Sequence, residues 1–275
     1  MPESHTITSG SQTTHRRGEV KYLLTKKQRH QLLLLIAPYV ELDTYPHSQI
    51  TSTYFDTVEN RILRRSFEKP LYREKIRVRS YGILQKLDHP CFLEFKKKLR
   101  GTVYKRRVSM TFSEAYCYLG SGVRPFESLT YLNNSQRAAA HCVLDEFDQA
   151  LERYGMLAPS LAVSYQRFSI RENGTDSLRI TFDTNIKWSS CPQNLVIANP
   201  THPLLEHDSY IMEIKAAAAM PLWLVEILAN LKIYPRSFSK IGKSYAAWLQ
   251  TTSPTCDFET EKESHGSRQS IWKCA

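Results

Sequence analysis

Lysine and arginine recur at every second position in several short segments of this sequence, and the spacing has chemical meaning. The clearest segments are residues 75–79 (Lys-Ile-Arg-Val-Arg) and 94–98 (Glu-Phe-Lys-Lys-Lys). Residues two apart share one face of a β-strand, so each segment would present a charged face and an apolar one. The pattern therefore predicts strands that expose rows of cations.

The same alternation occurs in residues 17–21, 165–167, 179–183 and 213–215. One such strand fits an ordinary antiparallel sheet with a solvated face, where Lys and Arg carry no function. The repetition favours another arrangement. If the apolar faces pack against surrounding helices, a closed barrel turns the charged faces toward one lumen.

A lumen with many cations and few carboxylates requires a multivalent anion, because unpaired buried charge is unstable. Arginine offers planar bidentate donors and lysine a point charge, which together suit successive phosphoryl groups. The few carboxylates, Glu19, Glu94 and Glu213, are then candidates for binding Mg²⁺ or Mn²⁺, which prefer hard oxygen ligands. The chain's six cysteines form no CxxC pair, so no zinc site or disulfide framework is predicted.

Composition supports an anionic partner. The 275 residues include 37 Lys and Arg against 27 Asp and Glu, a formal net charge of +10. No segment approaches the roughly 18 apolar residues of a membrane span, and no signal-peptide core is evident, so we expect no transmembrane segment and a cytoplasmic location. Residues 1–15 and 251–275 are polar and predict disordered tails around one domain, residues 16–250. The sequence does not define an oligomeric state.

The elements that must position these charges follow from hydrophobic period and capping residues. Strands are expected at residues 17–23, 50–56, 73–81, 91–98, 102–111, 161–171, 177–184 and 209–216. Helices are expected at residues 25–37 (N-cap Thr25), 113–119 (Ser113), 135–154 (Ser135), 221–232 and 240–250. The helices punctuate the strands without alternating with them, which predicts an α+β fold that is mainly β and disfavours a doubly wound parallel sheet.

Eight short motifs occur in a recognisable order. They are residues 17–22 (RGEVKY), 54–57 (YFDT), 75–81 (KIRVRSY), 92–96 (FLEFK), 165–167 (YQR), 178–183 (LRITFD), 211–215 (IMEIK) and 237–240 (SFSK). Together they resemble the catalytic domain of the vacuolar transporter chaperone (VTC) family, which belongs to the triphosphate tunnel metalloenzymes. The resemblance implies an eight-stranded antiparallel tunnel barrel with flanking helices. It also implies transfer of the γ-phosphoryl group of ATP to a growing inorganic polyphosphate chain, with release of ADP and Mn²⁺ or Mg²⁺ as cofactor.

The resemblance also suggests which residues form the site. Cations expected to take part in catalysis are Arg77, Arg79, Lys96, Arg167, Arg179 and Lys240. Residues expected to bind nucleotide or polyphosphate are Lys21, Lys98, Arg107, Tyr165, Lys215 and Ser239. Glu213 resembles the metal-binding glutamate of the family, with Glu19 and Glu94 as further metal candidates. In residues 105–107 one cation should also face inward, but the register of the strand is ambiguous by one residue. Arg107 is taken as the inward cation.

One departure bears on the reaction. Simple tunnel triphosphatases begin with Glu-x-Glu-x-Lys, whereas Arg17 stands at the first of these positions, which favours synthesis over hydrolysis. A non-catalytic polyphosphate-binding module and a metal-dependent tunnel triphosphatase remain as alternatives. Nucleic acid is not expected as a partner, because aromatic residues interleaved for base stacking are not evident. Without the sensing and membrane domains of the eukaryotic polymerases, the domain resembles the stand-alone bacterial type.

Overall fold

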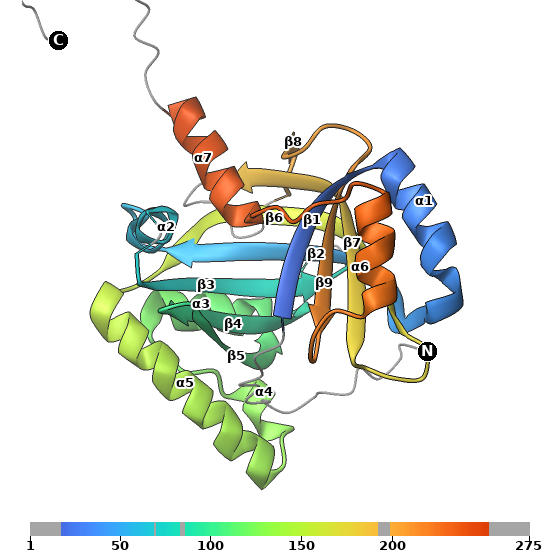
Figure 1. Cartoon of the computed structure of the whole chain (residues 1–275). Helices are drawn as coiled ribbons and strands as arrows, with labels where there is room; N and C mark the ends of the chain where they lie inside the picture. Colours follow the sequence, from blue (N-terminus) through green and yellow to red (C-terminus); the bar gives the residue numbers. More distant parts are fainter. Residues whose placement is uncertain (1–17, 69, 83–85, 192–198, 253–275) are drawn as a thin grey trace, which may run out of the picture.

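One antiparallel sheet organises the protein in the computed structural model, which describes residues 18–68, 70–82, 86–191 and 199–252 (Figure 1). Its strands are β1 (Gly18–Thr25), β2 (Val40–Asp56), β3 (Tyr72–Tyr81), β4 (Pro90–Leu99), β5 (Thr102–Thr111), β6 (Ala158–Glu172), β7 (Leu178–Ser190), β8 (His202–Pro203) and β9 (Ser209–Ala216). Eight long strands follow the order β1-β9-β7-β6-β2-β3-β4-β5, and the short β8 pairs with β7. The predicted mainly β, antiparallel α+β class is confirmed.

The sheet curves around a central space but is not closed by hydrogen bonds. Within the described residues no pairing joins β1 to β5, although side chains from both strands line the same cavity. Strand β2 begins at Val40, ten residues before the predicted start at residue 50. Its first half lacks alternation and contains Pro46, and its pairing with β6 shifts register between Leu42 and His47. This irregularity explains why the pattern did not reveal the first half of the strand.

Helices cover the outer face and one part of the inner face of the sheet. They are α1 (Lys26–Ile36), α2 (Arg61–Phe67), α3 (Phe112–Ser121), α4 (Glu127–Thr130), α5 (Asn134–Tyr154), α6 (Leu222–Asn230) and α7 (Lys240–Thr252), and a 3₁₀ turn (Ala37–Tyr39) follows α1. Thr25 caps α1 as predicted. The caps of α3 and α5 are Thr111 and Asn133, in place of the predicted Ser113 and Ser135.

Helix α2 was not predicted, because its capping group lies outside the usual position. The buried carboxylate of Asp56 accepts hydrogen bonds from the backbone N–H groups of Thr57, Ile62 and Leu63. These bonds satisfy donors at the start of the helix that have no partner within it. A cap five residues before the first helical residue is not visible to a search for an N-cap residue.

Three apolar clusters explain which face of each strand turns inward. The outer faces of β3, β4 and β5 pack against α3 and α5, and those of β1, β7 and β9 pack against α1 and α6. The third cluster joins Tyr54, Val163 and Tyr165 on the inner face to Ile241 and Tyr245 of α7. The helices thus cover the apolar faces, and the charged faces of the strands turn toward the centre.

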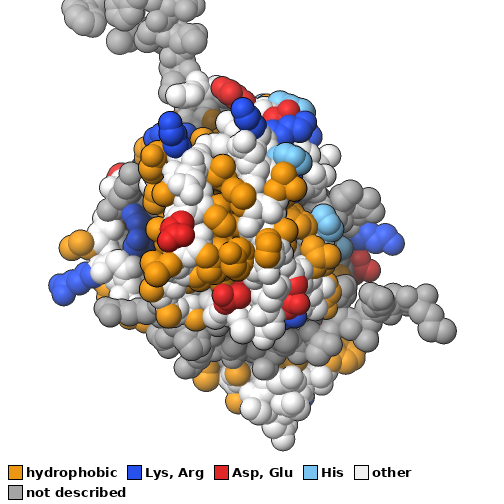
Figure 2. Space-filling view, turned by 45° about the vertical axis from the view of Figure 1, so that its right-hand side comes forward, with side chains coloured by type: hydrophobic (Ala, Val, Ile, Leu, Met, Phe, Trp, Pro, Cys, Tyr) orange, Lys and Arg blue, Asp and Glu red, His pale blue; other side chains and the backbone are white. Residues whose placement is uncertain are grey.

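The outer helices leave part of their own apolar surface exposed. Leu32, Ile36, Leu224 and Leu228 are buried, as expected for core packing, whereas Leu34, Leu35, Leu222 and Val225 are exposed. Figure 2 faces this side of the molecule and shows apolar side chains gathered on it. None of the described helices is long and apolar enough to span a membrane.

Candidate functional site

The inner face of the sheet and α7 enclose a cavity of about 1150 Å³ that is strongly cationic. Its described lining holds twelve Lys and Arg side chains but two carboxylates. The cations are Lys21, Arg73, Lys75, Arg77, Arg79, Lys96, Lys98, Lys105, Arg167, Lys215, Lys240 and Lys243, and the carboxylates are Glu19 and Glu213. Such an excess of one sign in a confined space indicates a site for a multivalent anion.

Strand register places like charges directly opposite each other on this face. Lys96 pairs across the sheet with Lys75 on one side and Lys105 on the other, and Arg73 pairs with Lys98. Directly opposed like charges destabilise a sheet, so packing alone does not account for them. Lys96 has no hydrogen-bond or ion-pair partner in the part of the chain that the structure describes, which leaves its ammonium group available to a ligand.

Two of these lysines are only weakly basic. Burial, together with the neighbouring cations Lys96 and Arg73, lowers the pKa of Lys75 to about 8, although Tyr54 opposes this shift. Burial also lowers the pKa of Lys105 to about 8, and the nearby Glu94 carboxylate offsets only part of that effect. The cavity therefore resists further positive charge until an anion enters.

Glu94 holds the central arginines in place. Its side chain is 3% exposed, and its carboxylate accepts from Nε of Arg77 at 2.7 Å and lies 2.6 Å from Nη2 of that residue and 2.8 Å from Nζ of Lys105. Arg79 lies farther away, at 3.8 Å. Burial disfavours the charged carboxylate, but these cations outweigh it and hold the pKa of Glu94 well below its usual range.

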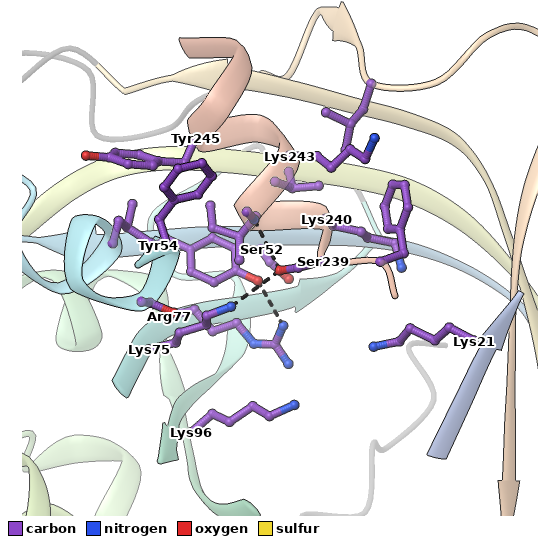
Figure 3. Close-up of a pocket in the computed structure, with 18 of the residues that line it drawn as sticks. Lys21, Ser52, Tyr54, Lys75, Arg77, Lys96, Ser239, Lys240, Lys243 and Tyr245 are labelled. Carbon is purple, nitrogen blue, oxygen red and sulfur yellow. Dashed lines mark hydrogen bonds between the residues drawn. The ribbon is translucent and has the colours of Figure 1, made fainter. Parts of the chain in front are cut away.

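Tyr54 supports the same arginine from the other side. Nη1 of Arg77 donates to the Tyr54 hydroxyl at 3.2 Å, and the guanidinium lies 5.9 Å from the centre of the Tyr54 ring. Figure 3 shows Lys75, Arg77 and Lys96 reaching into the cavity, with Lys21 pointing toward them from the facing strand. The guanidinium of Arg77 is thus fixed before any ligand binds.

A second buried carboxylate, Asp183, fixes two further cations. Arg167 donates to both of its oxygens, at 2.6 and 2.8 Å, and Nζ of Lys240 lies 2.5 Å away. The ammonium of Lys240 also lies 4.5 Å from the centre of the Tyr165 ring. Lys240 is the first residue of α7, so its contact with Asp183 ties the start of this helix to the sheet. Ser239, the preceding residue, accepts from the N–H of Gly242 in the first turn.

Glu19 and Glu213 lie together on neighbouring strands, around the ammonium of Lys21. The Lys21 nitrogen is 2.8 Å from Glu19 and 3.7 Å from Glu213, and Nζ of Lys215 is 2.8 Å from Glu213. Burial opposes ionisation, but the lysines outweigh it and lower the pKa of both carboxyls. Glu94 does not join this pair, because it is held by Arg77 and Lys105.

The donor set fits a divalent cation that is shared with a ligand. Glu19 and Glu213 are two ionised oxygen donors facing the same space, as Mg²⁺ requires when substrate phosphates complete its coordination. The described residues contain no group of three or more Asp, Glu, His or Cys able to hold a metal by themselves. These two carboxylates would therefore hold a metal only together with phosphate oxygens and water.

Two predicted cations lie outside the cavity lining. Nε of Arg179 lies 2.6 Å from Asp43 and 3.1 Å from Ser169, and its side chain is 52% exposed. Arg107 shares the inner face with Lys105, but its guanidinium lies over the ring of Phe92 at 4.9 Å, and Lys105 lines the cavity in its place. Arg17 falls outside the described residues.

The other predicted residues, Glu94 apart, line the cavity, and the structure adds some that sequence reasoning did not assign. Lys75 is the first residue of the alternating segment 75–79, Arg73 extends that alternation by two residues, and Lys243 follows Lys240 by one helical turn. The alternation and the helical period could have identified these three. Asp183 and Tyr54 stood within the recognised motifs, but nothing in the sequence shows that they contact Arg167 and Arg77.

A pre-positioned set of cations on the inner face of an antiparallel sheet makes this cavity a candidate polyanion-binding site. Comparison with protein families identifies the chain more closely: residues 16–249 match the VTC domain, and the chain belongs to this family. The comparison with curated proteins gives no match.

Two solved structures are similar to this chain at a low level. A candidate adenylate cyclase from Bacillus halodurans is 13% identical, with 84% of this chain and 96% of that chain covered and a TM-score of 0.47. A candidate adenylate cyclase from Vibrio parahaemolyticus is 11% identical, with 86% and 99% covered and a TM-score of 0.41. Similarity at this level carries no information about the reaction of this chain.

Proposed function

We propose that this protein is a polyphosphate polymerase, which transfers the γ-phosphoryl group of ATP to the end of an inorganic polyphosphate chain. The observation that carries the proposal is the cavity lining, in which like charges face each other across β3, β4 and β5. Membership of the VTC domain family supports it. A chain of phosphates is the ligand that would neutralise several successive rows of cations at once.

The reaction requires little covalent participation by the protein. A terminal oxygen of the polymer attacks the γ-phosphorus, the bond from that phosphorus to the oxygen bridging it to the β-phosphorus breaks, and ADP leaves with the electron pair. The attacking oxygen is already ionised, so no dedicated general base is needed. Catalysis then depends on holding the reactants in line and on stabilising charge on the transferred group.

The geometry suggests a role for each group. Arg77, fixed by Glu94 and Tyr54, and Arg167, fixed by Asp183, present guanidinium groups that need not reorganise when charge develops on the phosphoryl oxygens. Glu19 and Glu213 would hold a divalent cation. When bound, such a cation supplies further stabilisation of phosphate charge.

The direct test is to incubate the purified protein with ATP and Mn²⁺ or Mg²⁺, then to measure ADP and separate the products on a gel stained for polyphosphate. We expect polymer and ADP in the presence of metal. The Glu213→Gln variant should fold but give neither product, because it removes one of the two carboxylate donors. Binding of polyphosphate in EDTA without ADP formation in metal would instead indicate a non-catalytic binding module.

A tunnel triphosphatase is the second candidate, and the observation that favours it is the pair of neighbouring carboxylates, Glu19 and Glu213. Two carboxylates around one divalent cation also suit the activation of water. That activity predicts release of orthophosphate from tripolyphosphate with metal and no polymer from ATP.

A further inference from the structure

Helices α1 and α6 pack side by side on the outer face of the sheet and run in opposite directions. The Tyr39 ring, which follows α1, stacks on Trp223 at the start of α6, with the ring centres 4.3 Å apart and the planes 8° apart. At the other end of the pair, the side-chain amide of Gln28 donates to the backbone oxygen of Leu231. The last turn of α1 therefore lies beside the first turn of α6.

This end of the helix pair exposes a group of large apolar side chains. Figure 2 shows apolar side chains gathered on this face of the molecule, with Lys and Arg side chains around its edge. Single apolar residues on a surface are ordinary, whereas a group of this kind marks an interaction site. The exposed members are Leu34, Leu35, Tyr39, Leu222 and Val225.

The same face lacks positive charge, although the protein as a whole is basic. Residues 31–40 and 217–231 contain no Lys or Arg and a single carboxylate, Glu226. The lysines of α1, Lys26 and Lys27, lie in its first turn, at the opposite end of the helix pair. Surfaces that bind anionic lipid or nucleic acid carry Lys and Arg beside their apolar residues. The charge pattern therefore disfavours both of these partners.

The charge of the whole chain favours a second copy of the same protein as the partner. Two copies that each carry a formal net charge of +10 repel each other over most of their surfaces. That repulsion is weakest where both copies present residues 31–40 and 217–231. A two-fold axis also brings identical patches together, and an apolar patch is complementary to itself without any matching of charges.

We infer that the exposed ends of α1 and α6 form the interface of a homodimer, in which this apolar group of one copy packs against the same group of the other. None of its five members belongs to the cavity lining. The inference is therefore independent of the proposed function. It adds that one particle carries two cavities, each complete within its own chain.

Sedimentation velocity tests the inference over protein concentrations from about 1 to 100 μM, where ordinary protein interfaces dissociate. The unchanged protein should shift from monomer to dimer and form nothing larger, because a two-fold contact is closed. A variant with Leu34→Gln and Leu222→Gln should raise the dissociation constant by about a hundredfold or more, because each change acts twice in the dimer. Raising the salt concentration should strengthen dimerisation, because it screens the repulsion between the two basic chains.

A matched control changes two apolar side chains of similar exposure elsewhere on the surface, with Leu71→Gln and Met156→Gln. Leu34 and Leu222 are 65% and 78% exposed, and Leu71 and Met156 are both 73% exposed. Because all four are exposed, each variant should keep its Tm within about 2 °C of the unchanged protein. The control should dimerise as the unchanged protein does. A monomer at every concentration, equal effects of the two variants, or dimerisation weakened by salt would overturn the inference.

Flotation with vesicles of phosphatidylcholine and phosphatidylglycerol tests the other occupant of an apolar face. The homodimer interface predicts no binding to these vesicles. Binding that the Leu34→Gln, Leu222→Gln variant loses and the control retains would assign the face to a lipid surface and overturn the dimer.

Discussion

Replacing Glu94 by Gln tests whether the central cations are held against their mutual repulsion by one buried carboxylate. The change keeps the shape of the side chain but leaves Arg77, Arg79 and Lys105 without a neutralising partner. Loss of one partner from a buried ion pair costs about 3–5 kcal/mol. The side chain of Lys105 is 41% exposed and that of Arg77 is 21% exposed, so water screens part of the loss.

We therefore expect a fall of about 3 kcal/mol in the free energy of unfolding, at the lower end of that range. For a domain of this size the loss corresponds to a decrease of about 6–12 °C in Tm, measured by differential scanning calorimetry. Tripolyphosphate should raise the Tm of the variant more than that of the unchanged protein, because an anion replaces the lost carboxylate and binding stabilises the folded state.

The pH dependence gives an independent check of the same interaction. The pKa of Glu94 in the folded protein lies below its unfolded value of 4.5, so its stabilisation is complete above about pH 4.5 and is lost as the pH falls further. The Glu94→Gln variant should lack this component. Its Tm should therefore fall less between pH 5 and pH 3 than that of the unchanged protein.

Glu146 of α5 provides a matched control, because its partners lie on the outer face of β4 and β5. It binds Lys97 and Arg106, which point from β4 and β5 to the outer face, and its side chain is 27% exposed. Glu146→Gln should cost less than about 1 kcal/mol and leave the ligand-induced shift unchanged. The reasoning fails if Glu94→Gln has a Tm within about 1 °C of the unchanged protein, or gains no more from tripolyphosphate.

Two further substitutions and one change of pH test the candidate site. Asp183→Asn should reduce kcat for polymer synthesis by about tenfold without raising the KM for ATP, because it disorders two cations without removing them; steady-state kinetics measure this. Raising the pH from 7 to 9 should weaken tripolyphosphate binding in calorimetry, because Lys75 and Lys105 lose charge near pH 8, while the free protein becomes more stable as the repulsion disappears. Tyr54→Phe should lower Tm by about 2–4 °C through loss of about 1 kcal/mol from its contact with Arg77.

Much of the fold could be predicted because charged and apolar residues alternate along several of the strands. Residues 73–81 and 91–98 became β3 and β4 almost unchanged, since their apolar faces pack against helices along their whole length. Helix α2 and the first half of β2 could not be predicted in the same way. The first depends on the distant cap Asp56, and the second contains Pro46 and has an irregular register.

The sequence predicted which strand faces carry the cations of the candidate site, but it did not predict which residues those cations contact. Alternation correctly placed Arg77, Lys96 and Arg167 in the cavity, because inward orientation is a local property of a strand. It failed for Arg179, whose partner Asp43 lies 136 residues earlier in the chain. Whether a cation is free or neutralised depends on such distant partners, which one sequence does not reveal.

The distribution of carboxylates therefore carries more functional information than the number of cations. Glu94 and Asp183 are buried beside the cavity and orient arginines without cancelling the surplus charge in front of them. Glu19 and Glu213 face the cavity, where they neutralise lysines, and we propose that they also hold a metal. Among the described residues, Lys75 and Lys96 have no carboxylate partner, so positive charge stays uncompensated on the strands that carry Arg77 and Glu94. An arrangement of this kind suits a polymer that must be held during each phosphoryl transfer and still move by one phosphate afterwards.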